Sequence, residues 1–296
     1  MTHKVVVTGV TGSLGSHLAG HLLSQGIRVI GVSRGVPANP EVEHVAIDLA
    51  NPDSVIPSFG TTPVINCAAI TRDGWDSALE RDTRQITASA LALTAGPFVH
   101  ISSSSVYDLT KPSVNQAEDD LVRGHRFLNS YGYAKWMAEE QVESSGLNAV
   151  ILRPHAIYGD GDNTLLPRLR AAVRFGNLFL PGGGSALHAM TSMQNVAGAV
   201  DAALAALAGG LTGTTVVNVT DASPRRLENV IAEALGPEVR IRSAPVGFAL
   251  AIAKRAEKRT PEGTEPRLSE YAVRQLAYER TYSLDRLRET LGFEPQ

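Results

Sequence analysis

Short apolar segments recur through the first half of the chain and alternate with longer segments of helical pattern. Most of them are apolar at nearly every position, which is typical of parallel strands that are buried on both faces. A strand exposed to water on one face would instead alternate apolar and polar residues. The pattern predicts strands at residues 5–8, 28–32, 45–47, 64–66, 98–102 and 149–152.

The clearest helix is predicted between the first two strands, from Gly12 to Ser24. Leu14, Leu18 and Leu22 recur at every fourth position and form one apolar face, and Gly26 follows as a stop signal. Strands that alternate with helices indicate a parallel sheet covered on both faces. The first half therefore predicts an α/β fold with a Rossmann-type doubly wound sheet.

The second half has a different pattern, with more helices and no long series of strands. Helices are expected at residues 196–207, 227–235, 247–257 and 284–291, and a strand at 216–219. Segment 259–267 is polar and contains two prolines, so we expect a mobile surface loop. We predict a dinucleotide-binding domain over residues 1–160, joined by some later segments, and a smaller, mainly substrate-binding part over residues 161–296.

Composition narrows the classes of protein to which the chain can belong. The net charge is −3, which gives no reason to expect a nucleic-acid or membrane-surface partner. Cys67 is the single cysteine, so no intrachain disulfide can form. We find no secretory signal and no apolar run near the ~20 residues of a membrane span. A cytoplasmic protein is expected. No His, Cys and acidic residues have metal-ligand spacing, so we expect no metal.

Three glycines follow the first strand at every third position. Gly9 suits a tight turn off the strand, Gly12 lets a pyrophosphate approach the helix N-terminus, and Gly15 allows close packing of helix on strand. The spacing is G-x-x-G-x-x-G rather than the G-x-G-x-x-G of most dinucleotide folds. A strand before the turn and a helix after it favour dinucleotide binding over a simple glycine-rich turn.

The end of the second strand indicates which dinucleotide is preferred. An acidic residue at this place would bond the 2′-hydroxyl of NAD, whereas a basic one suits the 2′-phosphate of NADP. The sequence has Ser33 and Arg34 here and no acid. We therefore predict a preference for NADP(H), with NAD(H) as the other possible cofactor. A solvated surface arginine is the alternative reading of Arg34.

A candidate catalytic group combines a serine-rich strand end with a later tyrosine–lysine pair. Four serines, residues 102–105, follow an apolar strand, whose carboxyl end should open into the ligand crevice. Tyr131 and Lys135 are four residues apart, so they lie on one face of a helix. A free phenol has a pKa near 10, and a nearby ammonium favours the phenolate. The pair could therefore exchange a proton while a hydride moves to or from a nicotinamide.

The order of these motifs resembles the extended short-chain dehydrogenase/reductase family, the NAD(P)-dependent epimerase/dehydratase group. Similarity to the 3β-hydroxysteroid dehydrogenase-like branch is found around residues 165–169 and 179–184. The matching motifs are Thr8–Gly15, Asp48–Leu49, Asn66–Ala69, Ser102–Tyr107, Tyr131–Lys135, Leu152–Pro154 with Ile157–Gly159, and Asn195–Ala197.

The resemblance implies a role for each matching residue. Tyr131 would be the catalytic acid/base, Lys135 its partner, and Ser103 the catalytic hydroxyl that holds the substrate oxygen. A homodimer formed through the Tyr131 helix is expected. The residues expected to bind the cofactor are Gly9, Thr11, Gly12, Ser13, Leu14, Gly15, Ser33, Arg34, Asp48, Leu49, Cys67, Ala68, Ala69, Lys135, Pro154, His155 and Ile157.

Two departures from the family pattern bear on the substrate. The Asn-Val-x-Gly-Thr stretch of many members is replaced by residues 83–87, which lack its Asn and Gly. The arginine with which nucleotide-sugar enzymes hold a diphosphate is absent near residues 188–190, and the segment is less polar. A small, rather apolar substrate is therefore expected. Candidate substrate residues are Arg72, Trp75, Ser104, Arg168, His188 and Met190, although each could instead have a packing or surface role.

These observations favour an NADP(H)-dependent oxidoreductase that interconverts a secondary alcohol and a ketone by a Ser-Tyr-Lys mechanism. One alternative is a nucleotide-sugar epimerase or dehydratase, which uses the same three residues and recycles a tightly held cofactor. Another is a non-catalytic NADP(H)-binding regulator, whose usual mark is loss of the Tyr or Lys. The sequence does not distinguish among possible small-molecule substrates or give the direction of the reaction.

Overall fold

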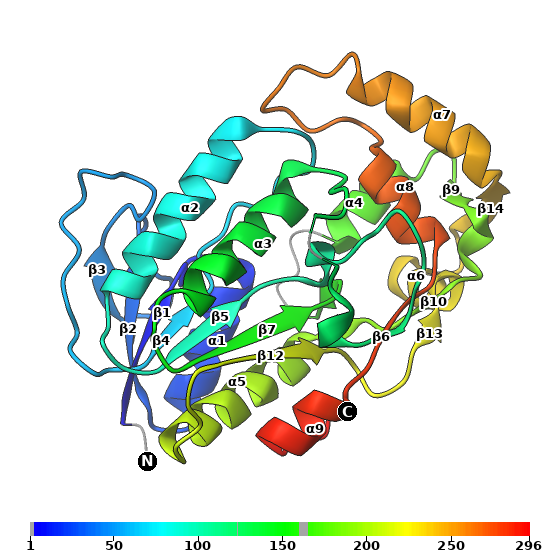
Figure 1. The fold of residues 1–296 in the computed structure, drawn as a ribbon. Coiled ribbons are helices and arrows are strands. Elements are labelled where there is room, and N and C mark those ends of the chain that lie inside the picture. Colours follow the sequence, from blue (N-terminus) through cyan, green and yellow to red (C-terminus); the bar gives the residue numbers. More distant parts are fainter. Residues whose placement is uncertain (1–2, 123, 160–164) are drawn as a thin grey trace.

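A seven-stranded parallel sheet forms the centre of the molecule (Figure 1). The computed structural model describes residues 3–122, 124–159 and 165–296. The strands of this sheet, in spatial order, are β12 (Thr214–Val219), β7 (Ala149–Pro154), β5 (Phe98–Ile101), β4 (Val64–Asn66), β1 (Lys4–Thr8), β2 (Arg28–Ser33) and β3 (Glu43–Ala46). The chain runs from β1 through β2 to β3 at one edge of the sheet. It then returns to the other side of β1 and runs from β4 through β5 and β7 to β12 at the opposite edge. The ligand crevice of such a sheet lies where this direction reverses.

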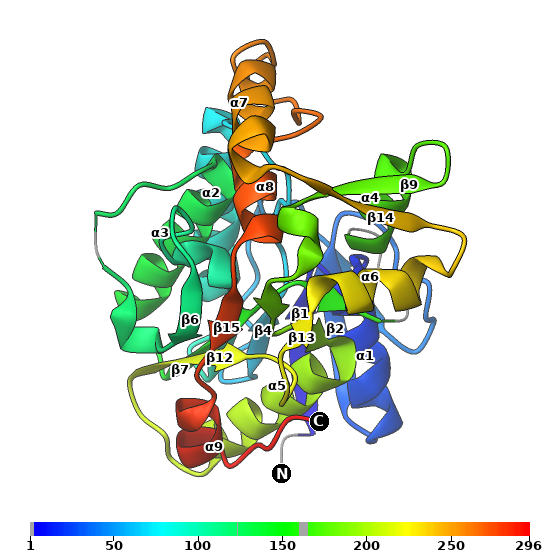
Figure 2. The same ribbon diagram turned by 90° about the vertical axis from the view of Figure 1, so that its right-hand side faces the viewer.

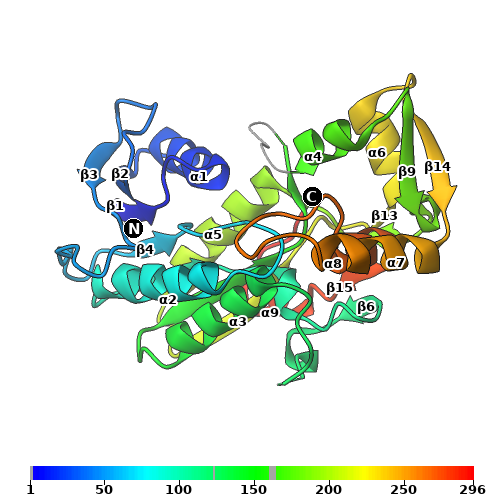
Figure 3. The same cartoon turned by 90° about the horizontal axis from the view of Figure 1, so that it is seen from above.

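Helices cover both faces of the sheet, as the view from above shows (Figure 3). α2 (Ser77–Ala92) and α3 (Ser130–Glu143) pack on one face, while α1 (Ser13–Ser24), α5 (Met193–Ala208) and α9 (Asp285–Leu291) lie on the other. Consecutive strand residues point to opposite faces. Each strand therefore contributes to two apolar layers, which explains why the strand segments are apolar at nearly every position.

The predicted fold class is confirmed, with small differences at the element ends. The six predicted strands of the first half are present, although the third is observed at Glu43–Ala46 rather than at residues 45–47. The strand predicted at 216–219 forms β12, which pairs in parallel with β7 and extends the central sheet. The four helices predicted in the second half are present as α5, α6 (Leu227–Leu235), α7 (Val246–Glu257) and α9.

A smaller part lies against the carboxyl ends of the central strands (Figure 2). It contains α4 (Leu165–Ala172), α6, α7 and α8 (Glu270–Ala277), together with short strands that the sequence pattern did not predict. These strands are β6 (Ser113–Gln116), β8 (Ile157–Tyr158), β9 (Asn177–Pro181), β10 (Leu187–His188), β11 (Thr191–Ser192), β13 (Arg225–Arg226), β14 (Arg240–Ala244) and β15 (Arg280–Tyr282). A domain boundary at residue 160 stays a prediction.

The segment between α7 and α8, residues 258–269, is called the strap below. We expected its central residues 259–267 to form a mobile surface loop. The strap is a surface loop, its mobility stays a prediction, and hydrogen bonds attach it to residues 73–77 around the start of α2. Glu262 accepts hydrogen bonds from the backbone N–H of Ser77 at 3.0 Å and from its hydroxyl at 2.7 Å. The Glu265 carboxylate accepts one from the Asp73 backbone at 2.9 Å. The polar composition of the strap thus matches its exposure at the surface.

Among the described residues, no helix combines the length and the apolar composition that crossing a membrane requires.

Candidate active site

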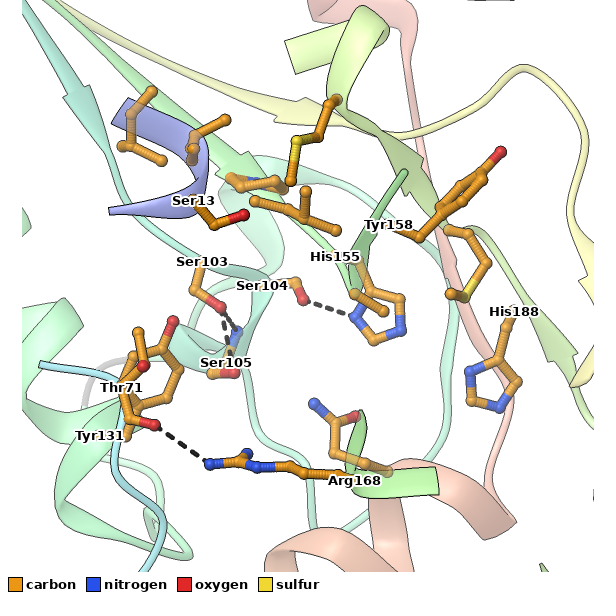
Figure 4. A pocket seen from close by; sticks show the side chains of 18 of the residues that line it. Ser13, Thr71, Ser103, Ser104, Ser105, Tyr131, His155, Tyr158, Arg168 and His188 are labelled. Carbon is orange, nitrogen blue, oxygen red and sulfur yellow. Dashed lines mark hydrogen bonds between the residues drawn. The ribbon is translucent and has the colours of Figure 1, made fainter. Parts of the chain in front are cut away.

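A cleft of about 720 Å³ lies between the carboxyl ends of the central strands and the smaller part. The glycine turn after β1 and the serines after β5 line one side of it. α4, α6 and α8 contribute to the other side. Figure 4 shows the labelled side chains that converge on this space from distant parts of the sequence.

The glycine turn has the geometry that a pyrophosphate requires. Gly9 adopts φ +65, and a Cβ at this position would meet the Ala68 backbone at 2.8 Å. A Cβ on Gly15 would lie 2.2 Å from the carbonyl oxygen of Gly9, so the helix can approach the turn only with glycine there. Gly12 is the N-cap of α1 and provides no side-chain hydrogen bond to it. The first backbone N–H groups of a helix have no intrahelical acceptor, so the start of α1 suits an anion.

The other expected cofactor residues fall into two groups. Those that line the cleft are Gly9, Gly12, Ser13, Leu14, Gly15, Cys67, Ala69, Lys135, Pro154, His155 and Ile157. Those that do not line it are Thr11, Ser33, Arg34, Asp48, Leu49 and Ala68. Arg34 is exposed, and the Ser33 hydroxyl donates to the carbonyl of Gly35 at 2.7 Å. A Cβ on Gly35 would touch Thr11 at 3.9 Å, so the Arg34 turn lies beside the glycine turn.

α3 brings Tyr131 and Lys135 to the cleft. Asn129 caps the helix by accepting a hydrogen bond from the Gly132 backbone at 3.0 Å. Lys135 is buried, and its Nζ donates to the carbonyl oxygen of Ile101 at the end of β5 at 2.7 Å. One turn further along, Glu139 forms a buried ion pair with Arg153 of β7 at 2.7 Å. Two consecutive turns of α3 are thus attached to the sheet by polar contacts.

The serine turn after β5 provides the third element of the candidate catalytic group. The Ser103 side chain accepts a hydrogen bond from the Ser105 backbone N–H and donates one to the Ser105 hydroxyl, both at 3.1 Å. Ser103 also lies near enough to Tyr131 to lower the pKa of its phenol. Beyond it, the Ser105 hydroxyl lies 2.9 Å from that of Tyr271 in α8. The turn therefore connects the Tyr131 side of the cleft to the smaller part.

The protonation behaviour of the pair differs from the expected one. Burial raises the pKa of Tyr131 to about 12, and the nearby Tyr271 adds to this, whereas Ser103 and Arg168 oppose it. Burial lowers the pKa of Lys135 to about 8, against the influence of Cys67 and Glu139. We expected the ammonium, together with a positive nicotinamide, to bring the Tyr131 pKa down; in the structure burial dominates, and Lys135 is not among the groups that shift this pKa. A neutral Tyr131 is the form that can donate a proton.

Most of the expected substrate residues line the same cleft, namely Arg72, Ser104, Arg168, His188 and Met190. Trp75 does not line it and is half exposed. Arg168 pairs with Glu265 of the strap at 2.7 Å, and Arg72 pairs with Asp76 at 2.7 Å. Both arginines are therefore partly neutralised at the edge of the cleft.

Comparison with known proteins identifies the family. The model of the NAD dependent epimerase/dehydratase family matches residues 5–219, most of the chain. The chain belongs to the epimerase/dehydratase family. The predicted resemblance is thereby confirmed, and the chain is an NAD(P)-dependent enzyme of the extended short-chain dehydrogenase/reductase type.

Relatives within the epimerase/dehydratase family include oxidoreductases. A 2-alkyl-3-oxoalkanoate reductase from Stenotrophomonas maltophilia (strain K279a) is 29% identical, over 99% of this chain and 95% of that protein. A 3β-hydroxysteroid dehydrogenase/Δ5→4-isomerase from Mycobacterium tuberculosis (strain ATCC 25618 / H37Rv) is 26% identical, over 99% of this chain and 86% of that protein. The solved structure of MoeE5 in complex with UDP-glucose and NAD has a TM-score of 0.70 at 23% identity, covering 99% of this chain and 93% of that one. This last likeness concerns the fold.

Several cleft residues of this epimerase/dehydratase family member escaped the sequence analysis. Tyr271 and Gln275 belong to α8, a helix that the pattern did not predict. They carry no motif, and their only signal is Ser269, which caps α8 by accepting from the Ala272 backbone at 2.8 Å. An apolar wall formed by Leu227, Val230, Ile231 and Leu276 also lines the cleft.

Proposed function

We propose that the protein is an NADP(H)-dependent reductase that converts a ketone to a secondary alcohol on a small, rather apolar substrate. The observation that carries this proposal is the convergence of Ser103, Tyr131 and Lys135 on the cleft that the glycine turn also lines. The turn offers an anion site, and the three side chains offer a proton donor with its supporting groups, within one space.

Each of the three residues has a distinct task in this mechanism. A nicotinamide cofactor, when bound, would supply a hydride for the carbonyl carbon. Ser103 donates a hydrogen bond to the carbonyl oxygen, and Tyr131 gives that oxygen its proton as negative charge develops. Lys135 would bind the nicotinamide ribose and, by its charge, would stabilise the phenolate that remains. The raised pKa of Tyr131 keeps the donor protonated before the reaction.

The preference for NADP(H) rests on the second strand. Arg34 is exposed beside the glycine turn, where an adenosine 2′-phosphate would lie, and its neighbour at the strand end is Ser33 rather than an acid. A guanidinium can bind a phosphate through two parallel hydrogen bonds. We propose that Arg34 binds the 2′-phosphate in this way.

The substrate is proposed from the composition of the cleft wall and from the relatives. Leu227, Val230, Ile231 and Leu276 offer a carbon chain an apolar surface. The relative from Stenotrophomonas maltophilia is named for the reduction of 2-alkyl-3-oxoalkanoates, which combine a ketone with an alkyl chain. We propose 3-oxo acids with a medium-length chain as the first substrates to test.

A nucleotide-sugar epimerase or dehydratase is the second candidate, because MoeE5 has the same fold and binds UDP-glucose and NAD. The apolar wall argues against a sugar diphosphate in this cleft. A non-catalytic regulator is less well supported, since Ser103, Tyr131 and Lys135 all line the cleft. A homodimer formed through α3 stays a prediction.

The test measures oxidation of NADPH by the purified protein with 3-oxooctanoate and with its methyl ester. Turnover with NADPH, its loss on Tyr131→Phe by about 10³-fold or more, and retained NADPH binding by that variant would support the proposal. Tightly held NAD(H) released on denaturation, with no turnover of either ketone, would favour the epimerase or dehydratase instead.

A further inference from the structure

Two buried histidines line the cleft beyond the serine turn. His155 follows β7, His188 lies in β10, and their ring centroids are 5.9 Å apart. The two residues are 4% and 3% exposed, and Nε2 of each is buried without a hydrogen-bond partner among the described residues. Leaving such a buried polar atom unpaired costs its full desolvation penalty. Two unpaired nitrogens in one cleft therefore indicate a ligand group that pairs with them.

A hydrogen bond connects this histidine pair to the reacting end of the cleft. The Ser104 hydroxyl lies 2.8 Å from Nδ1 of His155, and Ser104 directly follows Ser103 (Figure 4). When the Ser104 hydroxyl donates to Nδ1, the neutral ring carries its proton on Nε2. Nε2 of His155 is then a donor that the described residues leave unpaired. A ligand group held there lies only a few bonds from a carbonyl held by Ser103.

A buried positive charge lies behind the two histidines. Arg280 is fully buried in β15 and is the register partner of His188 in β10. Its guanidinium donates to the carbonyl oxygens of Leu109, Lys111 and Arg274, and no carboxylate pairs with it in the described part of the chain. Hydrogen bonds to carbonyls leave the net charge in place. This end of the cleft therefore favours a negative group.

The acidic side chains that line the cleft are held by other partners. Asp221 accepts hydrogen bonds from the Tyr158 hydroxyl at 2.7 Å and from the Asn195 amide at 2.7 Å. Glu233 pairs with Arg225. Asp73 accepts from the Asn129 amide at 2.8 Å and from the Ser269 hydroxyl at 2.5 Å. None of these carboxylates pairs with Arg280 or is among the groups that shift the pKa of His155 or His188, so Arg280 is the charged side chain that acts on the two rings.

We propose that His155 and His188 bind the carboxylate of an oxo acid whose ketone is reduced at Ser103 and Tyr131. The assignment rests on the proposed function and adds the chemical group that the far end of the cleft recognises. Each imidazole donates an N–H to a carboxylate oxygen, and Arg280 stabilises the negative charge from behind. A neutral ester or methyl ketone would bring no negative charge to the two imidazole N–H groups and to Arg280.

The experiment measures binding, so that it does not depend on turnover. Isothermal titration of the NADP⁺ complex compares 3-hydroxyoctanoate with its methyl ester, because 3-hydroxy acids do not decarboxylate as 3-oxo acids do. We expect the wild-type protein to bind the acid at least about tenfold more tightly than the ester, equivalent to about 1.4 kcal/mol. His188→Phe should abolish this preference, and His188→Asn, which keeps a hydrogen-bond donor, should retain part of it.

A matched control is His125→Phe, which changes an imidazole that does not line the cleft and should keep the preference for the acid. Circular dichroism and NADPH affinity verify that each variant is folded. Equal affinity of the wild-type protein for acid and ester, no binding of either, or equal loss of both in His188→Phe would overturn the assignment. Selective binding of the acid without any turnover would instead contradict the proposed reductase function and leave the carboxylate site standing.

Discussion

Arg153 and Glu139 form a buried two-pronged ion pair between β7 and α3, one helical turn beyond Lys135. Nη2 and Nε of Arg153 donate to the two carboxylate oxygens at 2.7 and 3.0 Å, and both side chains are 3% exposed. Glu139 also accepts from the Ser102 hydroxyl, next to Ser103. The pair therefore fixes the helix that carries Tyr131 relative to the strand end that carries Ser103.

Breaking this pair should destabilise the protein strongly. Glu139→Gln leaves Arg153 as an unpaired buried charge, so the free energy of unfolding should fall by about 3–5 kcal/mol in urea denaturation. Arg81→Ala, which removes an exposed pair with Asp82, should cost less than about 1 kcal/mol. A loss in Glu139→Gln as small as that of the control would show that the pair does not hold α3 in place.

The glycine turn can be tested with two glycines of the same helix. A Cβ at Gly15 would lie 2.2 Å from the Gly9 carbonyl oxygen, so Gly15→Ala must move α1 away from the turn. We expect a stability loss of about 1–3 kcal/mol and weaker NADPH binding in a fluorescence titration. Gly20→Ala meets nothing within 4 Å and should stabilise the protein by about 0.5–1 kcal/mol. Similar effects of both changes would contradict close packing at Gly15.

Arg34→Ala should separate the two cofactors. Loss of a charged hydrogen bond to the 2′-phosphate should weaken NADPH binding about tenfold or more, while NADH, which lacks that phosphate, keeps its affinity. Arg28→Ala, an exposed change at the other end of β2, should affect neither cofactor. Unchanged NADPH affinity in Arg34→Ala would remove the basis for the NADP(H) preference.

The histidine pair should make the protein sensitive to acid. Burial, with the charge of Arg280, lowers the pKa of His188 from 6.5 to about 4, and burial with His188 and Arg280 lowers the pKa of His155 well below 6.5. The unfolded chain therefore binds more protons than the folded one below pH 6.5. Stability contributed by the neutral rings is present above that pH and is lost as the pH falls toward 4.

The measurement compares unfolding free energies at pH 7 and pH 5. The unfolding free energy of the wild-type protein should be lower at pH 5 than at pH 7. In His188→Asn this decrease should be smaller by about 1–2 kcal/mol, because one titrating ring is gone. An identical pH dependence in the variant would mean that His188 is not held neutral by its surroundings.

Local chemistry explains which features the sequence could predict. The glycine turn and α1 depend on neighbouring residues, so the pattern of Gly9, Gly12 and Gly15 contains nearly all the information needed. Tyr131 and Lys135 share a helix face for the same reason. Their positions in the cleft agree with the family resemblance. Spacing alone places them on one helix face and leaves open whether that face meets the ligand.

The features that escaped prediction depend on distant contacts. α8 is short and follows a polar segment, and its helix is held by Arg274, which donates to the Thr110 carbonyl at 2.7 Å and pairs with Glu270. Tyr271 therefore gives no local sign that it reaches the Ser105 hydroxyl 166 positions earlier. The raised pKa of Tyr131 likewise follows from burial by the smaller part, which residue spacing cannot show.

The strap lies at one edge of the cleft, and its contacts there have their own free energy of opening. Its hydrogen bonds to residues 73–77 lie at the surface, and Glu265 also pairs there with Arg168, a cleft residue. Such exposed contacts open at a small fraction of the global unfolding free energy. α7 and α8 also pack on each other through Ala249, Ala253 and Val273, which lie outside the strap, so opening of these surface bonds alone would leave that packing in place. Entry of the proposed substrate would then depend on a local equilibrium, separable from both binding and chemistry.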